Sequence, residues 1–163
     1  MSYWSKGVFI DVIDGVIRRA RPKGDGISRA WHANGELAEE RTRVGGKTVG
    51  VFRKWHDNGQ LAFEEPYKDG KIDGIVNQWS RDGKLLGEYE MKTGKGIMRE
   101  WNDDGSPSLE LENITEGFDR GKVWDHLGKA REMFLRNGKP ISKKKFFERL
   151  KKDGIKFPSS AAT

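Results

Sequence analysis

The sequence contains no cysteine among its 163 residues. Disulfides, thiolate catalysis and cysteine-ligated zinc are therefore excluded, which fits a reducing compartment. Long apolar runs are missing as well. Asp11 and Asp14 interrupt the apolar stretch near the N-terminus, so we expect neither a signal peptide nor a membrane-spanning helix. From these absences we predict a cytoplasmic protein.

Hydrophobic residues are also scarce, at 34%, the same share as charged residues. A thick and dry globular core is therefore not expected. Yet the 21 Gly and 6 Trp argue against a disordered chain, because disordered segments are poor in aromatic residues. The composition indicates a folded chain with a thin core.

A pattern of Trp and Gly recurs along the chain. The members of the Trp column are separated by 24, 24, 22 and 23 residues and are Trp31, Trp55, Trp79, Trp101 and Trp124. A Gly follows each Trp by four residues, and another Gly precedes each of the first four by five residues. Columns that keep one period together indicate an internal repeat. The segment that begins at Gly7 is interpreted as a degenerate sixth copy.

Each copy is predicted to form a β-hairpin. An Asn-Gly or Asp-Gly step such as Asn34-Gly35 follows each of the first four Trp, and these dipeptides accept the positive φ angles of a two-residue turn. Such turns would bring charged residues of opposite sign face to face on one side of the sheet. The predicted opposed pairs are Arg29 with Glu40, Arg53 with Glu64, Asn77 with Glu88, and Arg99 with Glu110.

The same rule predicts small or apolar partners for the Trp residues. The residues expected opposite Trp31, Trp55, Trp79 and Trp101 are Ala38, Ala62, Leu86 and Ser108. Hairpins that stack edge to edge contact only their neighbours. The predicted fold is therefore all-β, an elongated single-layer antiparallel meander of five to six hairpins.

A short basic helix is predicted near the C-terminus, where it caps the last hairpin. Ser142 is the expected N-cap, and Phe146, Phe147 and Leu150 form one apolar side. The predicted organisation is a repeat array, a capping helix and a disordered tail, at residues 1–138, 139–154 and 155–163.

The positive charge is concentrated at the same end of the chain. Residues 121–163 hold 12 Lys and Arg against 4 Asp and Glu, a net charge of +8, whereas residues 1–120 carry 19 against 21, or −2. The basic patch of the predicted helix comprises Lys143, Lys144, Lys145, Arg149, Lys151 and Lys152. We interpret it first as the solvated side of a cap. Binding to anionic lipid or to nucleic-acid phosphates is the alternative.

The run GVFRKWHDNGQLAFEEPYKDGKIDG at residues 50–74 resembles the MORN repeat in its bacterial variant form. That form combines an aromatic residue, an Asn-Gly turn, a Leu and a Gly-Lys-x-x-Gly link. The resemblance extends over residues 7–138 and is clearest over 26–105, although Pro107 replaces the Leu of the fourth copy. It implies a twisted meander that serves as a docking or assembly module, in some cases at membranes. Bacterial members are often labelled antitoxins.

The sequence offers no catalytic or metal-binding constellation. His32 and His56 share a column, but equivalent residues of successive hairpins lie two strand spacings apart, about 9–10 Å, whereas metal–nitrogen bonds are about 2 Å long. No nucleophile elbow, phosphate-binding loop or zinc spacing is present. We therefore predict a protein that is not an enzyme and has no catalytic residue, metal or cofactor.

The Trp column allows two interpretations that can coexist: the packing layer of the sheet, or an aromatic strip for a partner. Trp and Arg are enriched at binding hot spots. The predicted partner-binding residues are Trp31, Trp55, Trp79, Trp101 and Arg53. The predicted function is docking of another protein, a toxin or an assembly component. An adaptor that binds lipid or nucleic acid through the basic patch is the alternative.

Overall fold

The computed structural model describes residues 2–5, 8–13, 16–19, 25–115 and 117–155. Its elements, in chain order, are β1 (Ser2–Ser5), β2 (Val8–Ile13), β3 (Val16–Arg19), β4 (Gly26–Trp31), β5 (Leu37–Val44), β6 (Lys47–Trp55), β7 (Leu61–Lys68), β8 (Lys71–Ile72), β9 (Gly74–Trp79), β10 (Leu85–Lys92), β11 (Lys95–Trp101), β12 (Pro107–Thr115), β13 (Phe118–Trp124), β14 (Ala130–Arg136), β15 (Lys139–Pro140) and α1 (Lys143–Lys152).

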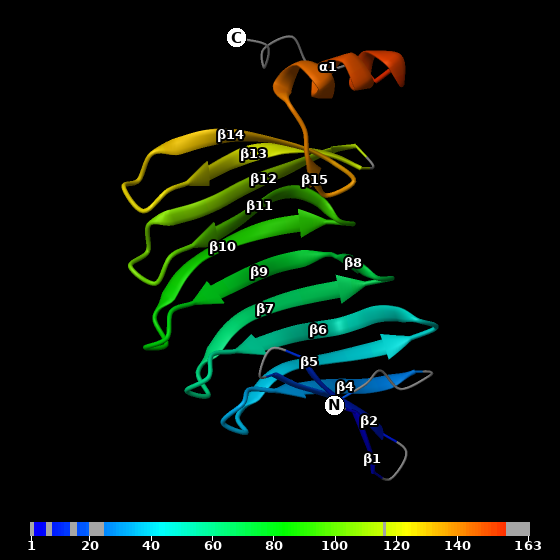
Figure 1. Ribbon diagram of the computed structural model, residues 1–163, viewed down its shortest axis with the longest axis vertical. Coiled ribbons are helices and arrows are strands. Elements are labelled where there is room, and N and C mark those ends of the chain that lie inside the picture. Colours follow the sequence, from blue (N-terminus) through cyan, green and yellow to red (C-terminus); the bar gives the residue numbers. More distant parts are fainter. Residues whose placement is uncertain (1, 6–7, 14–15, 20–24, 116, 156–163) are drawn as a thin grey trace.

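The strands form one antiparallel sheet that follows the order of the sequence. Only the short β8 leaves the main path, because β7 pairs with both β8 and β9. Figure 1 shows the strands stacked in a single layer, with α1 beyond β14 at one end. The predicted all-β meander with a short C-terminal helix is confirmed. The degenerate sixth copy, which precedes the other five in the chain, corresponds to the β2–β3 hairpin, although Gly7 itself lies outside the described residues.

The turn after each Trp differs from the prediction by one residue. The Gly35 amide donates to the His32 carbonyl at 3.0 Å and the His32 amide to the Glu36 carbonyl at 2.8 Å, so the loop contains three residues. Gly35 has a φ of 91°, and Asn34 is not among the residues with positive φ. This geometry is a three-residue hairpin loop, in which Gly takes the left-handed position. The Trp partners were therefore predicted wrongly.

The observed partners of the Trp residues lie one position closer to the turn. Leu37, Leu61, Leu85 and Pro107 face Trp31, Trp55, Trp79 and Trp101, in place of Ala38, Ala62, Leu86 and Ser108. The register shifts in the next step of each hairpin, where the second strand contains one extra residue. Such a bulge compensates for the extra loop residue.

Beyond the bulges, the predicted register is confirmed. Arg29 faces Glu40, Arg53 faces Glu64, Asn77 faces Glu88, and Arg99 faces Glu110. The three Arg–Glu pairs are also ion pairs, with nitrogen–oxygen distances of 2.6, 2.6 and 3.2 Å.

Turns with two residues of positive φ do occur, but in the links between the hairpins. These turns are Gly45-Gly46, Asp69-Gly70, Thr93-Gly94 and Asn137-Gly138. Each reverses the chain between directly paired residues, such as Val44 with Lys47 and Lys68 with Lys71. The links therefore carry the tight hairpin turns that the sequence had suggested for the Asn-Gly steps.

Most of the buried apolar side chains in the described chain form two small clusters rather than one core. One consists of Val76, Tyr89 and Met91, with Trp101 packed against it. The other joins Phe118 and Phe134 of the last strands to Phe146 and Leu150 of α1. The thin core expected from the composition is observed.

The predicted cap is observed as a packed helix. Ser142 is the N-cap, and its side-chain oxygen accepts a hydrogen bond from the Lys145 amide at 3.3 Å. The fully buried Phe146 ring contacts Phe118 and Phe134 with ring centroids 5.5 and 5.1 Å apart. The predicted tail lies outside the described residues, except for Ile155, which packs against this cluster.

Candidate protein-binding surface

The two faces of the sheet carry different side chains. We call the face with Arg53 and Glu64 the ladder face, and the face with Val76 and Tyr89 the cluster face. Cross-strand pairing extends the ladder face from Arg29 through Glu40, Arg53, Glu64 and Asn77 to Glu88. On the last strands it extends from Arg99 through Glu110 and Lys122 to Glu132. From strand to strand, positively and negatively charged side chains largely alternate on this face, so that directly opposed residues attract each other.

The charge ladder is interrupted where Asn77 stands in the column of Arg29 and Arg53. Glu88, which faces Asn77, is exposed, and so is Glu90 two residues later. Within the described part of the chain, neither carboxylate forms an ion pair. The middle of the ladder therefore holds unpaired negative charge.

A row of exposed apolar side chains lies beside the ladder on the same face. Ile27, Val51 and Ile75 each stand two residues before a ladder position and are 55, 40 and 54% exposed. Thr42 and Pro66 lie between them, opposite Ile27 and Val51. We call these five residues the apolar row. The 24-residue period of the row is visible in the sequence. The exposure of its side chains was not predicted, because the alternation of side chains along a strand does not show which face of the sheet is covered.

The predicted Trp anchors are half-buried, and one of them serves packing. Trp31, Trp55, Trp79 and Trp101 are all intermediate in exposure. Trp101 packs against the cluster of Val76, Tyr89 and Met91, and a side chain at Gly87 would collide with its ring. Trp55 instead lines a hollow of about 290 Å³ together with Lys54 and Phe63. The structure therefore gives Trp101 and Trp55 different surroundings.

The shared column of His32 and His56 connects successive hairpins. A ring nitrogen of His32 lies 2.8 Å from the Trp55 carbonyl oxygen, and that of His56 lies 2.9 Å from the Trp79 carbonyl oxygen. Gln78 makes the corresponding connection to Trp101, donating to its carbonyl at 2.7 Å and accepting from its amide at 3.0 Å. Sequence reasoning missed this role, because the carbonyl partners carry no side-chain signal.

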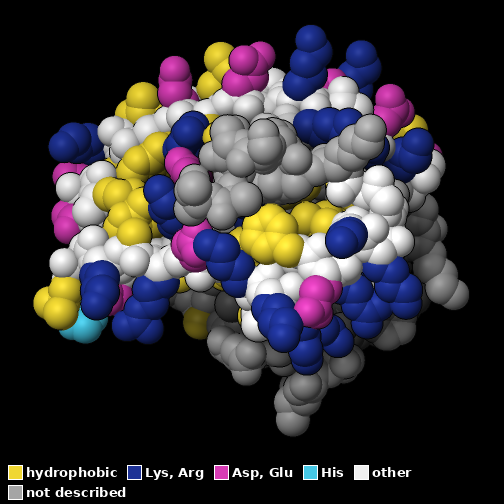
Figure 2. All heavy atoms as spheres, turned by 90° about the horizontal axis from the view of Figure 1, so that it is seen from above, with side chains coloured by type: hydrophobic (Ala, Val, Ile, Leu, Met, Phe, Trp, Pro, Cys, Tyr) yellow, Lys and Arg dark blue, Asp and Glu magenta, His cyan; other side chains and the backbone are white. Residues whose placement is uncertain are grey.

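The basic patch on α1 is exposed. Lys144, Lys145, Arg149, Lys151 and Lys152 lie on the solvent side of the helix, opposite the buried Phe146 and Leu150. Lys143 differs from them, because its amine pairs with Glu132 at 3.1 Å. Figure 2, seen from the α1 end, shows Lys and Arg side chains gathered beside exposed apolar atoms. The packing of α1 does not use the five exposed cations.

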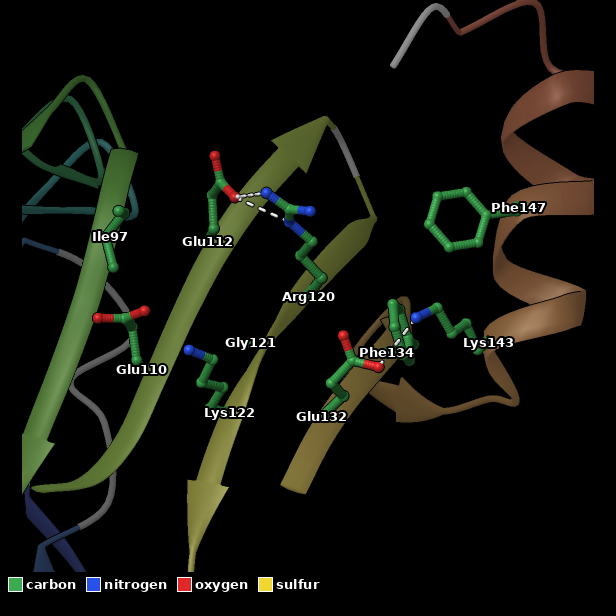
Figure 3. Close-up of a pocket in the computed structure, with 10 residues that line it drawn as sticks. All are labelled: Ile97, Glu110, Glu112, Arg120, Gly121, Lys122, Glu132, Phe134, Lys143 and Phe147. Atoms are coloured by element: carbon green, nitrogen blue, oxygen red, sulfur yellow. Dashed lines mark hydrogen bonds and ion pairs between the residues drawn. The ribbon is translucent and has the colours of Figure 1, made fainter. Parts of the chain in front are cut away.

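A hollow of about 240 Å³ lies on the ladder face of β11–β14, beside α1. Figure 3 shows Phe134 and Phe147 on its helix side, with Ile97 and Glu110 at the opposite end. Glu112 and Arg120 form an ion pair within it, and Lys143 reaches Glu132 from the helix. This hollow is the point where the covered end of the ladder face meets its open part.

The resolved pKa shifts do not assemble an acid–base pair. Burial, followed by the charge and hydrogen bond of Glu65, raises the pKa of Tyr67 to about 12. Burial likewise raises the pKa of Tyr89. Hydrogen bonds from Ser80 and Ser106 lower the pKa values of Asp82 and Asp104. None of these shifts moves a group toward neutral pH, as tuned catalytic pairs require.

The part of the chain that the structure describes contains no group of three or more His, Asp or Glu side chains arranged to hold a metal ion. It also contains no helix that is long and apolar enough to cross a membrane.

Comparison with known families agrees with the repeat geometry. The family model of the MORN repeat variant matches residues 48–69, which span most of the β6–β7 hairpin. No curated protein matches the sequence. The fold and this match define a repeat protein of the binding-module class, in which enzymes are not typical. Residues 48–69 are therefore assigned as a MORN repeat of the variant form.

Proposed function

We propose that this protein binds another protein, a toxin or a component of an assembly, along a surface that crosses several hairpins, and that it catalyses no reaction. The observation that carries the proposal is the apolar row. Three β-branched side chains recur on an open sheet face at the period of the repeat. Exposed apolar patches rimmed by polar residues mark protein interaction sites.

Among the predicted anchors, Arg53 lies on the same face as the apolar row. It lies on the ladder face, two residues from Val51, and its pair with Glu64 is half-exposed. Trp31, Trp55, Trp79 and Trp101 remain proposed contacts, but the hollow that Trp55 lines with Lys54 and Phe63 lies on the cluster face and does not adjoin the apolar row. A partner that follows successive hairpins meets equivalent residues at steps of about 9–10 Å.

The proposal is tested by affinity capture from the native host with matched surface variants. Val51→Thr and Ile75→Thr together remove apolar contacts from the ladder face without changing β-branching. Val123→Thr is the control, because Val123 is equally exposed at 40% but lies on the opposite face. We expect a stoichiometric protein partner that binds the wild type and the control and is lost from the double variant. If the double variant still binds the partner, the binding site does not lie on the ladder face.

A second candidate function is an adaptor that binds anionic lipid or nucleic acid through α1. The observation that favours it is the exposed row of five cations that the packing of α1 does not use. Binding of this kind weakens steeply with salt, because it depends on charge. Sedimentation with anionic vesicles and titration with single-stranded DNA, each at two salt concentrations, would identify it. Absence of binding at low salt would exclude both ligands.

A further inference from the structure

The structure shows what kind of element can cover the ladder face. At its C-terminal end the face is occupied by α1, whose Phe146 packs on Phe118 and Phe134. Lys143 of the same helix pairs with the ladder residue Glu132. The helix thus places an apolar side on the sheet and a cation on a ladder carboxylate.

The uncovered part of the same face repeats this chemistry. The apolar row supplies Ile27, Val51 and Ile75 in place of the Phe side chains, and Glu88 supplies a carboxylate without an ion-pair partner in the described chain. The open part and the part covered by α1 are continuous. The hollow lined by Ile97, Glu110 and Phe147 lies between them.

The apolar row does not run straight across the strands. Thr42 faces Ile27 on one side, but on its other side it pairs with Val49, two residues before Val51. The kind of element that covers this face is therefore inferred from α1, which places the apolar Phe146 and the cation Lys143 on the same face of the sheet.

We propose that the open ladder face of β4–β10 binds an amphipathic helix of the partner protein, with an apolar side that contacts the apolar row and a basic residue that pairs with Glu88. This inference rests on the proposed function, since it names the element of the partner that the apolar row receives. α1 is the example of such a helix within the chain itself.

The test uses a helix of known sequence as the probe. A fluorescent, lactam-bridged peptide of residues 141–155 is titrated into the full-length protein by fluorescence anisotropy. We expect saturable binding that weakens at least tenfold with V51T/I75T and is unchanged with V123T. Glu88→Gln should weaken binding severalfold at low salt and less at high salt. A peptide carrying Glu148→Pro, which cannot form the helix, should bind at least tenfold more weakly than the bridged peptide.

Three outcomes would overturn the inference. These are no binding at millimolar protein, equal binding by V51T/I75T and the wild type, or binding that is lost only with Phe134→Ala. The last result would mean that the peptide exchanges with α1 at its own site. If the peptide fails but the captured host partner still depends on Val51 and Ile75, the proposed function stands and only the helical partner is wrong.

Discussion

His32 and His56 occupy equivalent positions and bind the main-chain carbonyl of the Trp in the next hairpin. The hairpin tips are joined in the same way by Asn34 and Asn58, whose side-chain amides donate to the carbonyls of Asp57 and Arg81 at 2.5 and 2.7 Å. A single hairpin is marginal in water. Polar contacts between tips therefore add to the stability of an array with little buried apolar surface.

The first prediction concerns His56. His56→Ala removes the bond to the Trp79 carbonyl, and we expect the free energy of unfolding to fall by about 1 kcal/mol. Urea denaturation followed by circular dichroism measures the change. His126→Ala is the control, because His126 is exposed and has no such bond among the described residues. If His56→Ala and His126→Ala are equally stable, the contacts of the His32 and His56 column do not contribute to stability.

The second prediction concerns pH. The folded-state pKa of Tyr67 is raised to about 12 from 10.0, so its contribution to stability is complete below pH 10 and is lost as the pH rises toward 12. Tyr89 acts in the same direction. We expect Tyr67→Phe to lose less stability than the wild type between pH 10 and pH 12, measured by urea denaturation. If the stabilities of the wild type and of Tyr67→Phe fall in parallel over this pH range, ionisation of Tyr67 does not cause the loss of stability at alkaline pH.

At the scale of the element, the four hairpins β4–β5, β6–β7, β9–β10 and β11–β12 each combine a three-residue loop with a bulge. The loop shifts the register by one residue and the bulge shifts it back, so the Arg–Glu pairs meet directly. These pairs are half-exposed, and exposed pairs contribute little. The regular placement of these pairs therefore helps to define the register of the paired strands, whereas it adds little to the stability of the protein.

The third prediction concerns this register. Arg53→Glu should destabilise the protein by placing two carboxylates face to face, and adding Glu64→Arg should restore most of the loss. The coupling energy from a double-mutant cycle is expected at about 0.2–1 kcal/mol. Chemical denaturation of the four proteins measures it. No coupling at low salt would contradict the direct contact of these two side chains.

The fourth prediction concerns α1. Phe146→Ala opens a cavity among Phe118, Phe134 and Leu150, and we expect a loss of about 3–5 kcal/mol, with aggregation on mild heating. Lys145→Ala, on the exposed side of the same helix, should change stability by less than about 0.5 kcal/mol. Differential scanning calorimetry and size-exclusion chromatography measure both effects. A stable, monomeric Phe146→Ala variant would show that the cap is dispensable.

At the scale of the whole molecule, the two proposed binding surfaces are an open sheet face and a charged end. The ladder face carries the apolar row, whereas α1 carries five exposed cations. The two surfaces can be tested separately, because the apolar row lies on β4–β9 and the exposed cations lie on α1.

The fifth prediction uses this separation. Replacing Lys144, Lys145 and Lys151 with Gln should change the affinity for a captured protein partner less than twofold, because these side chains lie outside the ladder face. Surface plasmon resonance at two salt concentrations measures the affinity. If the Gln variant loses binding while V51T/I75T retains it, the binding site lies on α1 and the adaptor function is favoured.

The sequence by itself determined the repeat, the hairpins, the charge pairs and the capping helix. Each of these depends on local chemistry at fixed spacing: Gly at the turns, Arg and Glu eleven residues apart, and Ser142 before an apolar helix face. The family match over residues 48–69 falls on a hairpin that this periodicity had already identified. Local rules suffice because each hairpin contacts only its neighbours.

Only the tertiary structure decided how the side chains share the two faces. The sequence did not place the extra residue of the loop, because Asn-Gly fits both two- and three-residue loops. It did not assign the His column to main-chain carbonyls, which every residue possesses. It also did not separate the packed Trp101 from the exposed Ile75, because alternation assigns residues to faces but burial depends on which neighbouring strands and helices cover each face.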